Sequence, residues 1–181
     1  DPAVRALLFT GQPGIFTSGN DLEDFMLRPP ASADAPLLVF MKALMNLEKP
    51  VVVAVTGAAI GIGTTMLQHC DLVFVADDAK LTTSAPRLGL PAEYGLSWVL
   101  PRLVGIGHAA DLLISSRVIR GAEAERIGLA NRSLPSAEVL PAAREWARAV
   151  ADEVAPSSAA LAKAQATEQS ATFEASDPGQ H

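Results

Sequence analysis

Two short stretches, FTSGNDL (residues 16–22) and AVTGAAIGIG (residues 54–63), decide how this chain is interpreted. In each, apolar strand-forming residues run into a turn of small residues, and a helix is expected directly after the second turn. Two such turns can each direct a backbone N–H at one oxygen atom, and a helix start adds partial positive charge there. Paired amides of this kind form an oxyanion hole, so we predict chemistry on a carbonyl group.

Composition and charge restrict the class of protein. The chain has 181 residues, 49% of them hydrophobic, which suffices for one domain with a sizeable core. No apolar run approaches the roughly 18 residues of a membrane span, so no membrane partner is expected. The net charge is −6 without a cluster of Lys and Arg, which argues against a nucleic-acid partner. A single cysteine, Cys70, excludes an internal disulfide and favours a reducing, cytoplasmic location.

Apolar runs predict an α/β fold. Residues 51–55 and 71–76 are continuously apolar, as in strands covered on both faces, and residues 4–10 form a further buried strand. Helical spacing over 37–47 and 61–69 places helices between strands, which favours βαβ units. Beyond residue 95 the pattern is helical, with helices predicted over 96–103, 108–114, 122–127, 138–154 and 158–168.

The glycines of the second turn have two other interpretations. Gly57, Gly61 and Gly63 could belong to a dinucleotide-binding loop, but the third glycine position of that motif is Met66, which would obstruct close helix packing. The same glycines could serve only to allow a tight turn from strand to helix.

Taken together, these motifs resemble those of the crotonase, or enoyl-CoA hydratase/isomerase, superfamily. Besides the two turns, matching signatures follow in order as KPVVVAVTG (49–57), CDLV (70–73), LPRLVG (100–105) and AEAERIGLA (122–130). The resemblance implies repeated ββα units that form a spiral of approximately perpendicular sheets, closed by C-terminal helices. It also implies acyl-CoA substrates, no cofactor apart from the coenzyme A of the substrate, and a homotrimer or hexamer.

The resemblance suggests how the chain is divided. We expect residues 1–133 to form the crotonase-type α/β core, without the N-terminal strands that the family has. Residues 134–169 would form a helical segment of the same domain. The polar residues 170–181 would be a disordered tail.

Site residues follow from the resemblance by motif position. The oxyanion-hole donors would be the backbone N–H groups of Asn20 and Ile62. The other expected substrate-binding positions lie in or near the two turns and are Ser18, Gly19, Asp21, Gly61, Gly63, Thr65 and Ala85. Asp21 is also explained as a helix-capping residue.

Thr65 and Ala85 stand where the family's hydratases have their two glutamates. Hydration needs one group to activate water and another to deliver a proton, and neither residue can act as a carboxylate. Glu93, within GLPAEYGLS (89–97), instead matches the single glutamate of the family's Δ3,Δ2-enoyl-CoA isomerases. Moving a double bond needs only one base, so we expect an isomerase in which Glu93 is catalytic.

Several alternatives stay open. Glu93 could be an exposed loop acid or a helix-capping residue. The protein could be a hydratase or thioester hydrolase of the same superfamily, or a non-catalytic acyl-CoA-binding or assembly subunit. No metal site is expected, because His69 and His108 lack carboxylate or cysteine partners at metal-ligand spacing.

Overall fold

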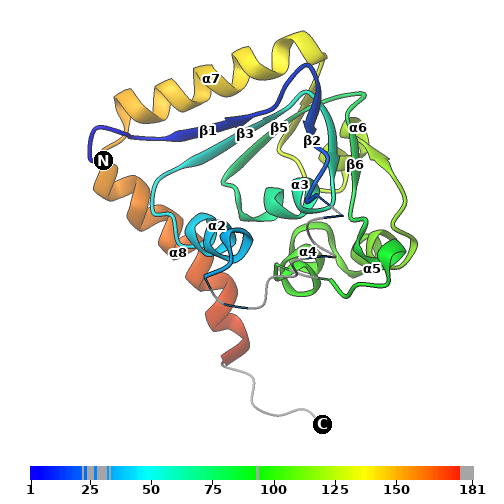
Figure 1. The fold of residues 1–181 in the computed structure, drawn as a ribbon. Coiled ribbons are helices and arrows are strands. Elements are labelled where there is room, and N and C mark those ends of the chain that lie inside the picture. The colour runs from blue at the N-terminus through cyan, green and yellow to red at the C-terminus, as the bar shows by residue number, and fades with distance from the viewer. Residues whose placement is uncertain (22, 24–26, 28–31, 33, 93, 176–181) are drawn as a thin grey trace.

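Two four-stranded sheets form the centre of the molecule (Figure 1). The computed structural model describes residues 1–175 apart from 22, 24–26, 28–31, 33 and 93, with side chains described up to residue 166. The first sheet has the order β1-β3-β5-β8 and is parallel throughout. Its strands are β1 (Leu7–Thr10), β3 (Val51–Val55), β5 (Leu72–Ala76) and β8 (Arg132–Leu134).

The second sheet has the order β2-β4-β6-β7, with only the β6–β7 pair antiparallel. Its strands are β2 (Gly14–Thr17), β4 (Gly57–Ile60), β6 (Lys80–Thr82) and β7 (Ile119–Arg120). The chain passes from the first sheet to the second three times, from β1 to β2, from β3 to β4 and from β5 to β6. Figure 1 shows that the strands of the two sheets run in different directions. The predicted α/β class, built from ββα units, is confirmed.

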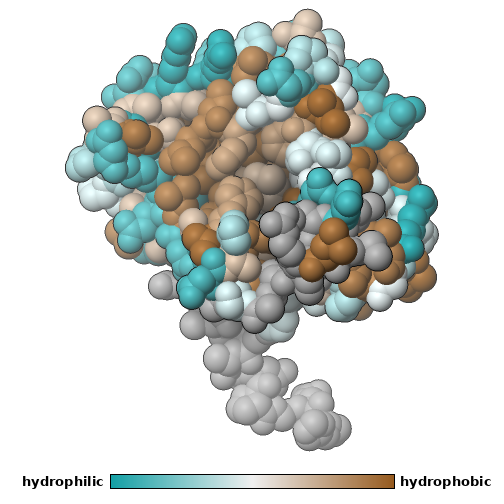
Figure 2. Space-filling model, viewed as in Figure 1, coloured by the Kyte–Doolittle hydropathy of each residue, from teal (hydrophilic) through white to brown (hydrophobic). Residues whose placement is uncertain are grey.

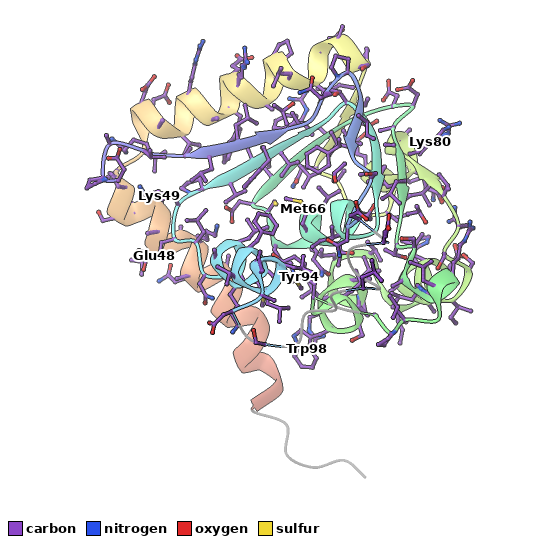
Figure 3. The ribbon with its side chains drawn as sticks, viewed as in Figure 1. Glu48, Lys49, Met66, Lys80, Tyr94 and Trp98 are labelled. Atoms are coloured by element: carbon purple, nitrogen blue, oxygen red, sulfur yellow. The ribbon has the colours of Figure 1, made fainter. Side chains whose placement is uncertain are left out.

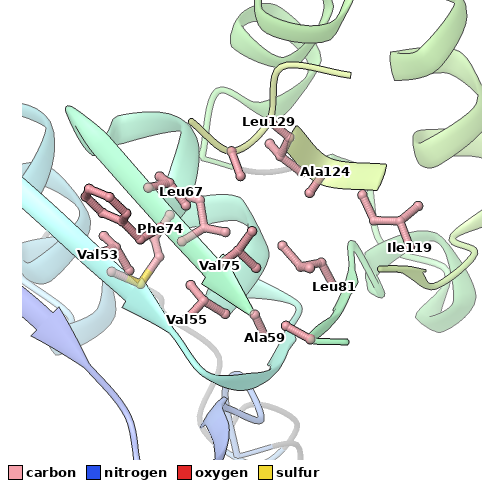
Figure 4. Close-up of a cluster of buried hydrophobic side chains, with 14 of the residues drawn as sticks. Val53, Val55, Ala59, Leu67, Phe74, Val75, Leu81, Ile119, Ala124 and Leu129 are labelled. Carbon is pink, nitrogen blue, oxygen red and sulfur yellow. The ribbon is translucent and has the colours of Figure 1, made fainter. Parts of the chain in front are cut away.

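Strand β3 is buried on both faces, as its continuous apolar sequence predicts. All five of its residues are inaccessible to solvent. Helix α7 packs on this strand and on β1 and β5, while side chains of the second sheet and of Leu67 fill the space on the other side (Figure 4). The core therefore lies between the two sheets and under α7, and burial of apolar surface there holds the sheets together.

The predicted helices all occur. They are α2 (Pro36–Met45), the short α3 (Ile62–Thr65) continued by the 3₁₀ turn η1 (Met66–His69), α4 (Leu96–Val104), α5 (Ile106–Ser115), α6 (Gly121–Arg126), α7 (Ser136–Glu153) and α8 (Pro156–Ala175). A second 3₁₀ turn, η2 (Ala85–Leu88), follows β6. None of the helices in the described part of the chain is long and apolar enough to cross a membrane.

Helix α8 is longer than expected. It continues to Ala175, through the first six residues of the segment for which a disordered tail is expected. The segment 170–175 contains no proline or glycine, so nothing in its sequence stops a helix before Pro178. Residues 176–181 lie outside the described part of the chain.

The face between α7 and α2 is apolar. Figure 2 shows apolar side chains gathered there, over the strands of the first sheet, with polar side chains around them. Strand β1 lies at one edge of this sheet. A broad apolar surface of this kind is typical of a region that contacts further protein.

Candidate active site

The two small-residue turns lie in contact. Strands β2 and β4 are parallel neighbours, with Thr17 opposite Ala59, so the turns that follow them leave the sheet at the same end. Gly19 has a φ of +92°, and a Cβ at this position would lie 2.9 Å from the carbonyl oxygen of Ile60. Only glycine permits both this backbone conformation and this close approach. The structure thus brings together two segments that are about forty residues apart in the sequence.

The second turn directs the start of α3 toward the same region. Gly61 has φ +58° and ψ −120°, and its carbonyl oxygen accepts hydrogen bonds from the N–H groups of Thr64 and Thr65. Among the described residues, none accepts a hydrogen bond from the N–H of Ile62 or of Asn20. Both amides are therefore available to an oxygen atom, and the start of α3 adds partial positive charge.

A cavity of about 240 Å³ opens where the turns meet. The predicted site residues that line it are Ser18, Gly19, Asn20, Gly61, Ile62, Thr65 and Ala85. Asp21 is exposed and does not line this cavity. Gly63 is buried instead, where a Cβ would lie 2.3 Å from Thr17 Cγ2, so this glycine allows α3 to pack against β2. Glu93 lies outside the described residues.

The walls of the cavity are mostly apolar. Leu37 and Met41 come from α2, and further leucines come from η2 and the segment up to the start of α4. Apart from Tyr94, none of the described lining residues has an ionisable side chain. A cavity of this composition suits an uncharged chain with a single polar group near the two amides.

The two positions that the resemblance matches to the hydratases' glutamates, Thr65 and Ala85, have no acid. The hydroxyl of Thr65 is almost fully buried and donates a hydrogen bond to the carbonyl oxygen of Gly61, 2.9 Å away. Ala85 begins η2 and presents only a methyl group. Neither residue can activate a water molecule or deliver a proton.

Tyr94 lines the cavity and lies between α2 and α4 (Figure 3). Its hydroxyl donates a hydrogen bond to the carbonyl oxygen of Met41 (3.1 Å). Its own carbonyl oxygen accepts hydrogen bonds from Gln68 Nε2 (2.9 Å) and His69 Nε2 (2.8 Å). Tyr94 also has a φ of +57°, which is rare outside glycine and needs such support from its surroundings.

Burial fixes the protonation of this cluster. The ring centroids of His69 and Tyr94 are 4.2 Å apart. Burial lowers the pKa of His69 and outweighs the opposing effect of its hydrogen bond to Tyr94, so the imidazole is neutral near pH 7. Because the Tyr94 carbonyl can only accept, His69 carries its proton on Nε2. Burial, together with the neighbouring Cys70, raises the pKa of the Tyr94 phenol, which therefore stays protonated.

The other titratable side chains provide neither a reactive thiol nor a metal-binding cluster among the described residues. Burial raises the pKa of the Cys70 thiol to about 12, with a smaller contribution from Asp71, so the thiol is not a nucleophile at neutral pH. In the part of the chain that the structure describes, no group of three His, Cys, Asp or Glu side chains could hold a metal ion.

Sequence reasoning missed the apolar wall of the cavity. Leu37 and Met41 lie on a helix whose sequence is apolar on several sides, so nothing marks the face that lines a cavity. One feature of the sequence could have drawn attention to Tyr94 as a site residue. It is the only tyrosine of the chain, and it directly precedes Gly95.

Comparison with known proteins identifies the class to which this fold and site belong. The family model described as enoyl-CoA hydratase/isomerase matches residues 1–177. Probable enoyl-CoA hydratase echA8 of Mycobacterium leprae is 35% identical over 151 residues, which are 83% of this chain and 59% of that protein. Crotonyl-CoA hydratase of Syntrophomonas wolfei is 36% identical over 152 residues, which are 81% of this chain and 58% of that protein. The chain thus spans about three fifths of the length of these curated relatives.

Solved structures agree with this assignment. Pseudomonas aeruginosa OdaA superposes with a TM-score of 0.89 at 45% identity, over 93% of this chain and 68% of that one. The enoyl-CoA hydratase/isomerase of Pseudoalteromonas atlantica gives a TM-score of 0.86 at 34% identity, over 97% of this chain and 70% of that one. Fold and site together define a protein of the crotonase superfamily. The chain belongs to its enoyl-CoA hydratase/isomerase family.

Proposed function

We propose that this protein binds acyl-CoA thioesters and moves a C3 double bond to the 2-trans position, as a Δ3,Δ2-enoyl-CoA isomerase. The observation that supports this most is the cavity at the two turns. It has the backbone amides of Asn20 and Ile62, neither of which donates to any residue that the structure describes, and no acid at Thr65 or Ala85. Such a site can stabilise an enolate but lacks the pair of carboxylates that hydration needs.

In the proposed mechanism, the N–H groups of Asn20 and Ile62 donate hydrogen bonds to the thioester oxygen. The carboxylate of Glu93 removes a proton from C2, and the C–H electron pair moves toward the carbonyl to give a dienolate. The dienolate then takes the same proton from Glu93 at C4, which leaves the double bond between C2 and C3. Loss of one oxyanion donor typically lowers kcat by about 10²–10³-fold, so the two amides would provide much of the catalysis.

A hydratase is the second candidate, because the relatives from Mycobacterium leprae and Syntrophomonas wolfei are named as hydratases. The lack of acids at Thr65 and Ala85 argues against it. The same lack suits a third candidate of another class, a non-catalytic acyl-CoA-binding or assembly subunit. That subunit would bind acyl-CoA without turnover.

We further propose that the protein acts in the cytoplasm as a homotrimer or hexamer, with no cofactor beyond the coenzyme A of its substrate. The exposed isoleucines Ile106 and Ile114 of α5 support an oligomer, because each is 82% accessible in the single chain.

The test is to incubate the protein separately with a 3-enoyl-CoA and a 2-trans-enoyl-CoA while following the absorbance of the conjugated thioester. An isomerase produces conjugation from the first substrate and leaves the second unchanged. Loss of conjugation from the second substrate would show hydration. Binding of both without any change in absorbance would show a non-catalytic subunit.

A further inference from the structure

We propose that Met41 and Tyr94 form the end wall of the acyl cavity and limit the substrate to apolar acyl chains no longer than about octanoyl. This inference rests on the proposed function, because it assumes that an acyl-CoA thioester occupies the cavity. It adds the substrate class and the residues that set chain length.

The course of α3 and η1 separates Tyr94 from the two amides. This segment begins at Ile62, lines the cavity at Thr65 and ends at His69, whose ring stacks on Tyr94. From residue 62 to residue 69 the chain advances by about 10–14 Å, at roughly 1.5 Å per α-helical and 2.0 Å per 3₁₀ residue. An acyl chain that starts at the amides and runs along this segment would therefore meet Tyr94.

The end wall is rigid because it joins separate parts of the fold. The Tyr94 hydroxyl donates to the carbonyl oxygen of Met41 on α2, while Gln68 and His69 hold the Tyr94 backbone. Tyr94 is only 7% exposed, so most of its ring is packed against other parts of the chain. The side chain of Met41 lines the cavity beside it and is the more adaptable member of the pair.

The volume of the cavity indicates the length of chain that it can surround. A cavity of about 150 Å³ accepts benzene, with six carbon atoms, so 240 Å³ accommodates about ten non-hydrogen atoms. The carbonyl carbon, the oxygen and the sulfur of the thioester account for three of these, which leaves about seven further carbons. The distance is compatible with this length. About 10–14 Å less a contact distance of about 3.5 Å leaves room for roughly five to eight bonds of an extended chain.

The chemistry of the wall restricts the acyl group further. No described lining residue carries a charged side chain at neutral pH. A carboxylate or ammonium group at the far end of the acyl chain would therefore lose its hydration without gaining a partner. The expected acyl groups have an apolar end.

The test is to titrate the full chain with saturated straight-chain acyl-CoAs from butyryl to myristoyl by calorimetry, which measures binding without turnover. Affinity should rise about three- to fourfold per added methylene and stop rising at about octanoyl. The chain length at which affinity stops rising is called the end point here. In Met41→Ala this end point should move to chains longer by about three carbons, because three side-chain atoms beyond Cβ are removed. Alanine is the best helix former, so α2 should be retained.

Met45→Ala is the matched control, since it makes the same change on the same helix at a side chain that is 53% exposed and outside the cavity. Its end point should stay at octanoyl. The inference is wrong if affinity rises steadily to myristoyl, or if Met41→Ala does not move the end point. In those cases acyl-CoA still binds and the proposed function stands, whereas failure of every acyl-CoA to bind overturns both.

Discussion

Replacing Gly19 by alanine should disable the first oxyanion donor and leave the rest of the fold in place. The φ of +92° costs a residue with a Cβ about 1–2 kcal/mol. The new Cβ would also lie 2.9 Å from the carbonyl oxygen of Ile60, closer than real Cβ atoms come. Ile60 is held in β4 by its pairing with Thr82, so the turn that carries Asn20 has to move instead.

The assay compares stability and turnover in the same variant. We expect the free energy of unfolding in urea to fall by about 1–2 kcal/mol. Turnover of a 3-enoyl-CoA should fall much further, by about 10²–10³-fold in kcat, because the Asn20 N–H no longer points at the thioester oxygen.

Gly14→Ala separates backbone strain from the effect on the site. Gly14 has a φ of +80°, and a Cβ there would meet nothing within 4 Å. This variant should lose about the same stability and keep its turnover. If Gly19→Ala also keeps its turnover, the contact between the two turns does not position an oxyanion donor.

Three further predictions concern the residues around the site and the attachment of α8. Tyr94→Phe should lower the free energy of unfolding by about 1 kcal/mol in urea denaturation, because the hydrogen bond to Met41 is lost while the ring remains. Lys163→Met should lower the free energy of unfolding by about 1 kcal/mol and speed proteolysis of α8. The reason is the loss of the ion pair between Lys163 Nζ and Asp71 Oδ2, which lie 2.8 Å apart. Since burial lowers the pKa of His69, the unfolded chain binds its proton more readily, and stability should fall as pH drops below about 6.5.

Matched variants test each of these predictions. Equal stability of Tyr94→Phe and the unaltered protein would show that the hydroxyl does not hold α2. Lys80→Met removes an exposed lysine at the start of β6 and should leave proteolysis unchanged. His108→Gln should keep the loss of stability below pH 6.5, whereas His69→Gln should reduce it. The account of His69 fails if both variants behave alike.

The sequence predicted those parts of the fold whose pattern is local. Strand β3 is continuously apolar and is buried on both faces, and the helices beyond residue 95 begin and end within a few residues of their predicted limits, α8 excepted. The strands β7 and β8 were not predicted, because they have two and three residues and exist only through pairing with β6 and β5. Such short strands carry too little sequence to show a period.

The site too has parts that the sequence could predict and parts that it could not. The turns at Gly19 and Gly61 could be located because glycines and small residues mark them, and the structure brings them into contact. The end of the cavity could not be located, because the hydrogen bond from Tyr94 to Met41 joins residues 53 positions apart. Nor could the sequence show that η1 continues α3 as a 3₁₀ turn that ends against Tyr94.

In the proposed mechanism a single glutamate moves the proton while the two amides hold the enolate. Glu93→Gln tests this mechanism most directly. Turnover of a 3-enoyl-CoA and binding of octanoyl-CoA are measured on the same preparation. Glu125→Gln is the control, because Glu125 is an exposed residue of α6. The account predicts that Glu93→Gln loses at least about 10²–10³-fold in turnover, as expected for removal of a general base, and still binds octanoyl-CoA. Unchanged turnover in Glu93→Gln would contradict it.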